Sequence, residues 1–207
     1  MRNEYTWEIK ATSTPLLIKK CSHCHNDRFY CSEKFRLNAQ KKNIDVWLIY
    51  RCKKCDNTIN MTIFSRIKTS SINKKLHKQL SENQIQAAWK YAFSYDIKQK
   101  NNIELDFKSV EYKILHDNIT LENILSSDIE IITFKIKYPF DFNLKLSSVI
   151  RACLNISSKQ LERLIELEVI SIQEKYLQKK HKVKNESIIK IEVRKLKHNM
   201  ESKKLNN

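Results

Sequence analysis

Four of the six cysteines occur in two C-x-x-C pairs, a spacing typical of metal ligands. The pairs are Cys21–Cys24 and Cys52–Cys55, separated by 27 residues. A C-x-x-C turn places two sulfurs on one side of a metal, and two such turns complete the tetrahedron that Zn²⁺ prefers. Because four cysteines leave no open position for water, we predict one structural Zn²⁺. Redox or disulfide chemistry of a single pair remains the alternative.

Other side chains near the pairs are weaker ligand candidates. His23, His25 and Cys31 lie close enough in sequence to replace a cysteine ligand. We expect His23 to be solvated and Cys31 to pack as a small buried hydrophobe. Cys153 falls on the apolar side of a predicted helix and is expected in the core.

The segments around the cysteine pairs have the pattern of β-strands. Residues 5–10 alternate with period two, and Leu16–Ile18, 46–50 and 57–63 are short apolar or alternating runs. Strands therefore precede, separate and follow the two pairs, which is the pattern of a zinc ribbon.

The rest of the chain predicts an α+β fold. Apolar spacing and capping residues indicate helices, and alternation indicates strands. The expected elements are helices over 72–95, over 145–154 and after Ser157, and strands at 110–114, 129–138, 169–172 and 187–193. Residues 96–108 are polar and are predicted to form a loop. The expected domains are a zinc ribbon (1–67), a central α+β segment (68–140), a small α+β domain (141–194) and a charged, frayed tail (195–207).

The chain contains no glycine, so turns with positive φ must use other residues. Asn tolerates the left-handed region better than most residues. Asn57, Asn155 and Asn185 are the candidates for such positions.

The formal net charge is +16, and both ends of the chain are basic. Residues 1–67 carry +7, residues 68–174 carry +1, and residues 175–207 carry +8. Such a surplus favours a polyanionic partner, most simply nucleic acid. A composition rich in Lys, Asn and Ile also fits A/T-rich codons, so codon usage is an alternative source of the charge.

The segment between the cysteine pairs mixes bases, an aromatic residue and amides. Lys34, Arg36, Lys41 and Lys42 are its cations, and this composition suits contacts to phosphates and bases. The alternative is an insertion containing a helix with a solvated charged face.

Several classes of function find no support in the sequence. No apolar run approaches the ~20 residues of a membrane span, and residues 1–20 show no signal peptide. We therefore expect a cytoplasmic protein. Neither a glycine-rich phosphate loop nor H-E-x-x-H occurs, so we predict a protein that is not an enzyme.

The N-terminal half resembles a bacterial family known only as domain of unknown function 1062. Besides the two cysteine pairs, the resemblance rests on a motif from Phe35-Arg36 through Lys41-Lys42 to residues 45–51, and on residues 88–93. The resemblance implies no function, because the family is uncharacterised.

The C-terminal segment resembles the S4-type RNA-binding domain. The matching positions are Lys145-Leu146, Ser157, Leu164-Ile165, Ile170-x-Ile172 and Lys182-Val183 through Ile188-Ile189. The sequence departs from the family pattern at Ser147, Ser158, Glu168 (a family glycine) and Gln173-Glu174 (a family Asn-Gly turn). The resemblance implies that two short helices present Lys145, Arg151, Lys159 and Arg163 to the phosphates of structured RNA.

These observations together predict a non-catalytic, zinc-containing RNA-binding protein that acts on structured RNA such as ribosomal or transfer RNA. RNA is favoured over DNA as the partner, and no membrane partner is expected. A DNA-binding regulator that uses the basic ribbon and a zinc-stabilised protein-interaction module are the two alternatives.

Overall fold

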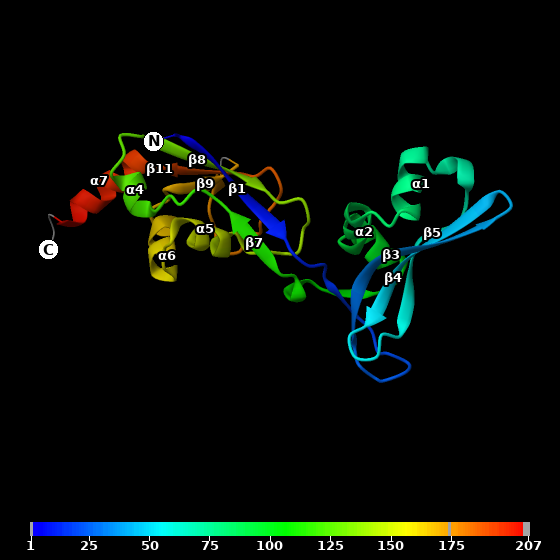
Figure 1. The fold of residues 1–207 in the computed structure, drawn as a ribbon. Helices are drawn as coiled ribbons and strands as arrows, with labels where there is room; N and C mark the ends of the chain where they lie inside the picture. Colours follow the sequence, from blue (N-terminus) through cyan, green and yellow to red (C-terminus); the bar gives the residue numbers. More distant parts are fainter. Residues whose placement is uncertain (1, 174, 205–207) are drawn as a thin grey trace. The chain divides into compact units, whose positions relative to one another are not determined.

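The structure, a computed structural model, describes residues 2–173 and 175–204 (Figure 1). It has the predicted α+β composition and divides into two compact units. Residues 11–111 form one, here called the cysteine unit, and the remaining described residues form the other, here called the six-stranded unit.

The cysteine unit is built on a five-stranded sheet with the order β5-β4-β3-β2-β6. Its strands are β2 (Leu16–Ile18), β3 (Arg28–Gln40), β4 (Asn43–Cys52), β5 (Thr58–Lys68) and β6 (Glu104–Asp106). Neighbouring strands are antiparallel, and β3, β4 and β5 form a long meander. Strands thus precede, separate and follow the cysteine pairs as predicted.

One face of this sheet is covered by helices. β4 alternates strictly, with Ile44, Val46, Leu48 and Tyr50 buried. Three short helices contribute Leu80, Ala88, Ile97 and other apolar residues to the same core. They are α1 (Lys74–Ser81), α2 (Ile85–Ala92) and α3 (Tyr95–Lys100), with the 3₁₀ turns η1 (Thr69–Ser71) and η2 (Phe107–Ser109) on either side.

The six-stranded unit has the strand order β10-β9-β11-β8-β1-β7. The strands are β1 (Glu4–Ala11), β7 (Tyr112–Leu115), β8 (Ile131–Lys137), β9 (Ile170–Ile172), β10 (Lys175–Tyr176) and β11 (Ile188–Glu192). The helices are α4 (Leu121–Leu125), α5 (Leu146–Leu154), α6 (Ser158–Glu166) and α7 (Val193–Lys204). Trp7 stacks on Phe134 in the core, with ring centroids 4.3 Å apart. Among the described residues, none of the helices is long and apolar enough to cross a membrane.

The observed division of the chain differs from the one expected from the sequence, whose boundaries lay after residues 67, 140 and 194. β1 pairs in parallel with β8, with Trp7 opposite Ile136. This pairing joins the first strand to the second half of the chain. Residues 68–111 instead complete the core of the cysteine unit, because α1, α2 and α3 cover its sheet.

Two segments predicted to lack regular structure are ordered. Residues 96–108 contain most of α3, the strand β6 and the start of η2. Ser94 caps α3 by accepting a hydrogen bond from the backbone N–H of Ile97, whose side chain is buried. The predicted tail is helical as α7, with Val193 and Leu196 buried, and residues 205–207 lie outside the described part.

The left-handed backbone positions were predicted in part. Asn155, which follows α5, has φ 53° as expected. The predictions for Asn57 and Asn185 are wrong by one residue, because Asp56 (φ 55°) and Glu186 (φ 61°) take the left-handed conformation instead.

Candidate metal centre

The two cysteine pairs lie in turns at one end of the β2–β3–β4–β5 sheet. The first turn connects β2 to β3, and the second connects β4 to β5. Phe29 of β3 lies opposite Cys52 of β4, and the Lys53 N–H donates to the Arg28 carbonyl at 3.0 Å. This register brings the two turns side by side.

The four predicted ligands converge. Their Sγ atoms all lie within 4.8 Å of one another. Sulfurs of different turns lie 3.7 Å apart for Cys21 and Cys55 and 3.5 Å apart for Cys24 and Cys52. With Zn–S bonds of about 2.3 Å, a regular tetrahedron has S···S edges of about 3.8 Å. A disulfide requires about 2.05 Å, and all six cysteines are free thiols. The cluster therefore fits one tetrahedrally bound metal ion.

The two turns have the same sequence pattern and the same backbone. Both follow C-x-x-C-x-N, and the residue after the second cysteine is left-handed in each, His25 with φ 60° and Asp56 with φ 55°. In each turn the first cysteine exchanges backbone hydrogen bonds with the last two residues. The distances are 2.7 Å (Cys21 N to Asn26 O), 3.1 Å (His25 N to Cys21 O), 2.9 Å (Cys52 N to Asn57 O) and 3.0 Å (Asp56 N to Cys52 O). The metal centre is thus built from two copies of the same turn.

The asparagine that ends each turn donates to a sulfur of the other turn. Asn26 Nδ2 lies 3.6 Å from Cys52 Sγ, and Asn57 Nδ2 lies 3.7 Å from Cys21 Sγ. These crossed contacts place N–H dipoles on the first sulfur of each pair, where they stabilise thiolate charge.

Hydrogen bonds to the sulfurs shift the acidity of the cluster. Burial opposes ionisation of Cys21 and Cys52, but backbone N–H groups outweigh it and lower the pKa of both thiols, that of Cys52 to about 6. The backbone N–H of Asn57 favours the Cys55 thiolate, yet burial and the three neighbouring sulfurs raise the pKa of Cys55 to about 12. Without a cation the cluster does not hold four negative charges, whereas a divalent ion stabilises all four thiolates.

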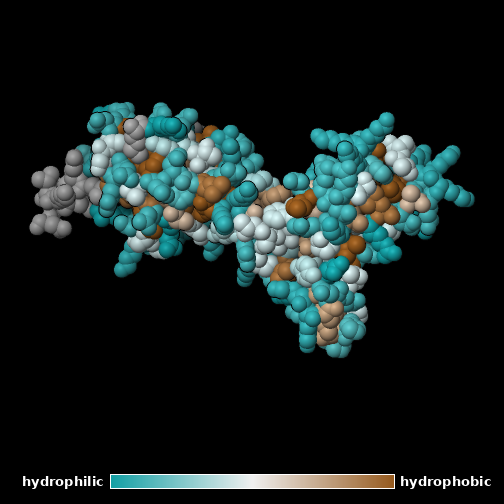
Figure 2. Space-filling view, viewed as in Figure 1, coloured by the Kyte–Doolittle hydropathy of each residue, from teal (hydrophilic) through white to brown (hydrophobic). Residues whose placement is uncertain are grey.

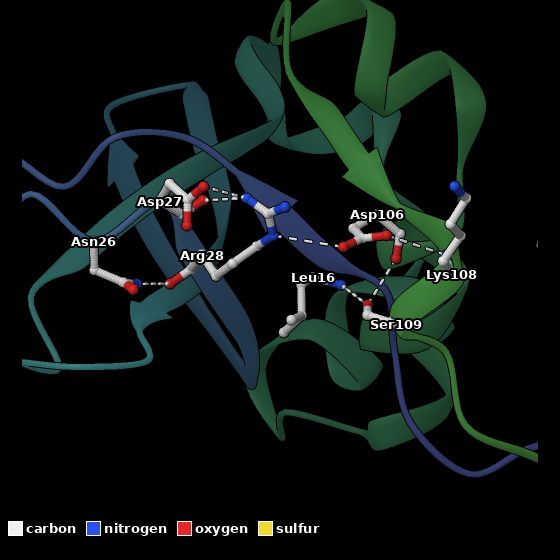
Figure 3. A network of polar contacts seen from close by, with 7 residues as sticks. All are labelled: Leu16, Asn26, Asp27, Arg28, Asp106, Lys108 and Ser109. Atoms are coloured by element: carbon white, nitrogen blue, oxygen red, sulfur yellow. Dashed lines mark hydrogen bonds and ion pairs between the residues drawn. The ribbon is translucent and has the colours of Figure 1, made fainter.

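Polar contacts anchor the first turn to the sheet (Figure 3). Asn26 Nδ2 also donates to the Arg28 carbonyl at 2.8 Å. The Arg28 guanidinium contacts the carboxylates of Asp27 (2.7 Å) and Asp106 on β6 (3.5 Å), and Ser109 Oγ donates to the Asp106 carbonyl. The turn and the edge strand β6 are therefore held together by one network.

The alternative ligands lie outside the cluster. His23 and His25 are exposed, and neither belongs to the group of side chains close enough to share a metal ion. Cys31 and Cys153 are buried as expected, and burial raises the pKa of both thiols to about 12.

Asn26 and Asn57 are site residues that sequence reasoning missed. The repeated C-x-x-C-x-N pattern was the signal that identifies them.

The predicted nucleic-acid contacts between the cysteine pairs lie on the β3–β4 hairpin. Lys34, Arg36, Lys41 and Lys42 are all exposed. Lys41 (φ 53°) begins the two-residue turn between Gln40 and Asn43. The segment is thus extended rather than helical, which corrects the alternative interpretation. Hydrophilic side chains cover the end of this hairpin in Figure 2.

The predicted contacts of the C-terminal segment lie on α5 and α6. Lys145 is the N-cap residue of α5, and Arg151 is in its last turn. Lys159 and Arg163 are four residues apart on α6, so they share one side of the helix. All four are exposed. These cations belong to the six-stranded unit, whereas those of the hairpin belong to the cysteine unit.

Comparison with known proteins identifies a family without assigning a function. Residues 37–176 match the family described as "Protein of unknown function (DUF1062)". The match begins after the first cysteine pair and includes the second. No curated protein and no solved structure matches the chain.

Proposed function

Because this chain belongs to the DUF1062 family, whose description names no activity, we propose from its own residues that it is a non-catalytic, zinc-stabilised RNA-binding protein. The proposal has two parts, the identity of the metal and the nature of the partner. Each is supported by different residues and has its own test.

Zinc is the proposed metal because the four candidate ligands are thiols in tetrahedral arrangement. Soft thiolates in an S₄ set select Zn²⁺ or iron. Four protein ligands leave no position for substrate, so the ion would stabilise the fold.

Elemental analysis of protein purified without added metal is expected to give about one zinc per chain. Iron would be revealed by visible absorption of the purified protein. A folded, metal-free protein, or one loaded with iron, would overturn the assignment.

Support for RNA binding comes chiefly from the exposed cations of α5 and α6. Among the described residues, none of Lys145, Arg151, Lys159 and Arg163 takes part in an ion pair. Lysine and arginine side chains without a protein partner are available to phosphates. They lie on helices whose other faces are buried, so they are held on a rigid scaffold.

The backbone around these helices supports the resemblance to S4-type domains. Glu168 has φ 52°, at the position where that family has glycine. Gln173 has φ 47°, where the family has an Asn-Gly turn, while Glu174 lies outside the described residues. A left-handed backbone is what glycine and asparagine favour, so the chain follows the path of the family with costlier residues. Ser157 caps α6 through a capping box with Gln160.

The proposed mechanism is backbone recognition. Structured RNA presents phosphates along both edges of its grooves, and side chains that contact them read shape more than sequence. Each neutralised phosphate releases counterions, so affinity should fall steeply with salt.

Charge reversal on the two helices tests the proposal. A fluorescent RNA stem-loop is titrated with the full-length, zinc-loaded protein, and affinity is followed by anisotropy at several salt concentrations. In the triple variant Lys145→Glu, Arg151→Glu, Arg163→Glu, binding should be lost or should show a salt slope smaller by about 2 to 3.

The matched control reverses three exposed lysines of the sheet in the same unit, Lys113, Lys137 and Lys175. Equal losses in the two triple variants would show that net charge alone attracts the RNA. Unchanged binding in the helix variant, or a preference for a DNA stem-loop of the same sequence, would refute the proposal. Failure to bind either nucleic acid would favour the protein-interaction alternative.

A further inference from the structure

The β3–β4–β5 meander has a second face, opposite the one covered by helices. On β4, Trp47 and Ile49 alternate with the buried Val46, Leu48 and Tyr50 and are half-buried. The half-buried side chains that pack against the core of the cysteine unit include Phe64 and Ile59, but among the described residues they do not include Trp47 or Ile49. We call the face that carries Trp47 and Ile49 the outer face.

Strand register places further side chains on the outer face. Arg36 of β3 and Thr62 of β5 lie opposite Trp47. Residues directly opposite each other in an antiparallel sheet project to the same side, so these three form one row. Trp47 thus has a cation beside it and a hydroxyl on its other side.

A second row lies nearer the metal centre. Tyr30 and Thr58 lie opposite Arg51, and all three are exposed. Arg51 lies four positions after Trp47 along β4, which is about 14 Å at the usual rise of a strand. Between the two rows, Asn60 lies opposite Ile49. The outer face therefore interleaves aromatic rings, arginines and an amide at regular spacing.

The cysteine unit that carries this face has a positive formal charge. The cysteine unit has 19 Lys and Arg residues against 9 Asp and Glu residues, a formal excess of +10 before metal binding. Two carboxylates near the outer face, those of Asp45 and Asp56, already accept hydrogen bonds. Asp45 Oδ1 accepts from the Arg66 N–H at 2.8 Å, and Asp56 Oδ1 accepts from Tyr30 Oη at 2.8 Å. Arg36, in contrast, is exposed and takes part in no ion pair with the described residues.

This combination is the chemistry of a surface for single-stranded nucleic acid. Unpaired bases stack on aromatic side chains, and arginines contact the phosphates that connect them. Amides and hydroxyls beside the rings bond to base edges. Bases inside a duplex are already stacked and paired, so they cannot use such a surface.

We propose that the outer face of β3–β4–β5 binds single-stranded nucleic acid, with one base stacked on Trp47 and the flanking phosphates held by Arg36 and Arg51. This site belongs to the cysteine unit and goes beyond the binding of structured RNA by α5 and α6. The metal centre would stabilise it by fixing the ends of the three strands.

The experiment titrates full-length, zinc-loaded protein against fluorescent 12-nucleotide oligouridine and oligodeoxythymidine, followed by anisotropy. Trp47→Ala should weaken binding about 5- to 100-fold, and Trp47→Phe should retain most of the affinity, because a phenyl ring still stacks. Arg36→Glu with Arg51→Glu should weaken binding and lower the salt slope by about 1.4. Tryptophan fluorescence should be quenched by the oligonucleotide in the wild type and not in Trp47→Phe.

The controls lie on α2 and α1 of the same unit. Ile85 is an exposed apolar residue of α2, so Ile85→Ala matches the loss of apolar surface. Lys75→Glu with Lys90→Glu matches the charge change, since both lysines are exposed on helices that cover the other face of the sheet. These variants should bind the oligonucleotides with nearly wild-type affinity.

Three results would overturn the proposal. The first is wild-type affinity in Trp47→Ala together with unchanged quenching in Trp47→Phe. The others are an equal loss in the Lys75/Lys90 control and equally tight binding of a duplex of the same length. Circular dichroism and zinc content identify any variant that fails to fold. If Trp47→Ala does not fold, the fluorescence quenching in Trp47→Phe and the affinity of the Arg36→Glu, Arg51→Glu variant test the proposal instead. The α5–α6 triple variant should keep oligouridine binding while it loses the stem-loop, so the two proposals fail separately.

Discussion

The crossed asparagine contacts at the metal centre give a sharp prediction about metal affinity. Asn26→Ala and Asn57→Ala each remove an N–H group that lies 3.6 Å or 3.7 Å from a sulfur of the opposite turn. Groups that hydrogen-bond to metal ligands commonly account for 10- to 100-fold in affinity. Both contacts are long for hydrogen bonds, so we expect the lower end of that range, about 10-fold or 1.4 kcal/mol for each variant.

The isosteric change Asn57→Asp separates an electrostatic role from a packing role. It keeps the shape of the side chain but replaces the N–H donor near Cys21 Sγ with a carboxylate oxygen. Four thiolates around Zn²⁺ already leave a net charge of about −2, so a further negative charge is repelled. Asn57→Asp should therefore bind zinc more weakly than Asn57→Ala.

Competition with a chromogenic zinc chelator measures these affinities directly. Thr58→Ala is the control, because Thr58 is exposed beside Asn57 and its side chain lies outside the network that surrounds the sulfurs. If Asn57→Asp binds zinc as tightly as the wild type, the N–H donors do not stabilise the thiolates. If Asn57→Ala binds zinc more weakly than Asn57→Asp, packing of the side chain rather than its charge accounts for its effect on zinc affinity.

Three further predictions concern ionisation, metal removal and the backbone. Cys31 and Cys153 have pKa values of about 12 in the fold against 9.0 for an unperturbed thiol, so the unfolded chain ionises first as pH rises. The contribution of each buried thiol to stability is therefore fully present below pH 9, and the free energy of unfolding should fall by about 1.4 kcal/mol for each thiol by pH 10. In urea titrations, the Cys→Ala variants should lose less stability than the wild type between pH 8 and 10. An identical loss would contradict the burial argument. In native protein at pH 8, iodoacetamide should modify four cysteines only after a chelator is added. It should modify all six only in denaturant, as counted by mass spectrometry. Modification of a fifth thiol in chelated native protein would show that one of the two buried thiols is accessible. Glu168→Gly should raise the free energy of unfolding by about 0.5–1 kcal/mol, because glycine relieves the left-handed backbone there; a lower Tm in this variant would refute the reasoning.

Much of the local structure follows from the sequence because it depends on near neighbours. The C-x-x-C spacing fixes two sulfurs within one turn, so the four ligands were identified without a structure. Alternation along β4 fixed which residues are buried, and Ser157 fixed the start of α6. These signals involve residues at most a few positions apart, and the physical rules for caps, turns and alternation act over that distance.

The tertiary structure alone decided the features that join distant segments. β1 pairs with β8 more than 100 residues away, which determined the division into units. The polar stretch 96–108 contains a helix and a strand because Ile97 and Leu105 complete a core formed by other segments. Burial of such residues depends on what packs against them, and a local pattern does not contain that information.

The metal centre combines both kinds of information. Its four thiols follow from spacing, whereas the donation of Asn26 and Asn57 across to the opposite turn follows only from the register of β3 with β4. The outer face is similar, since alternation places Trp47 away from the core while only strand pairing places Arg36 beside it. Sequence determines which residues are available and on which side of their own element they lie. Contacts between elements depend on register, and a shift of one residue would move every side chain to the other face.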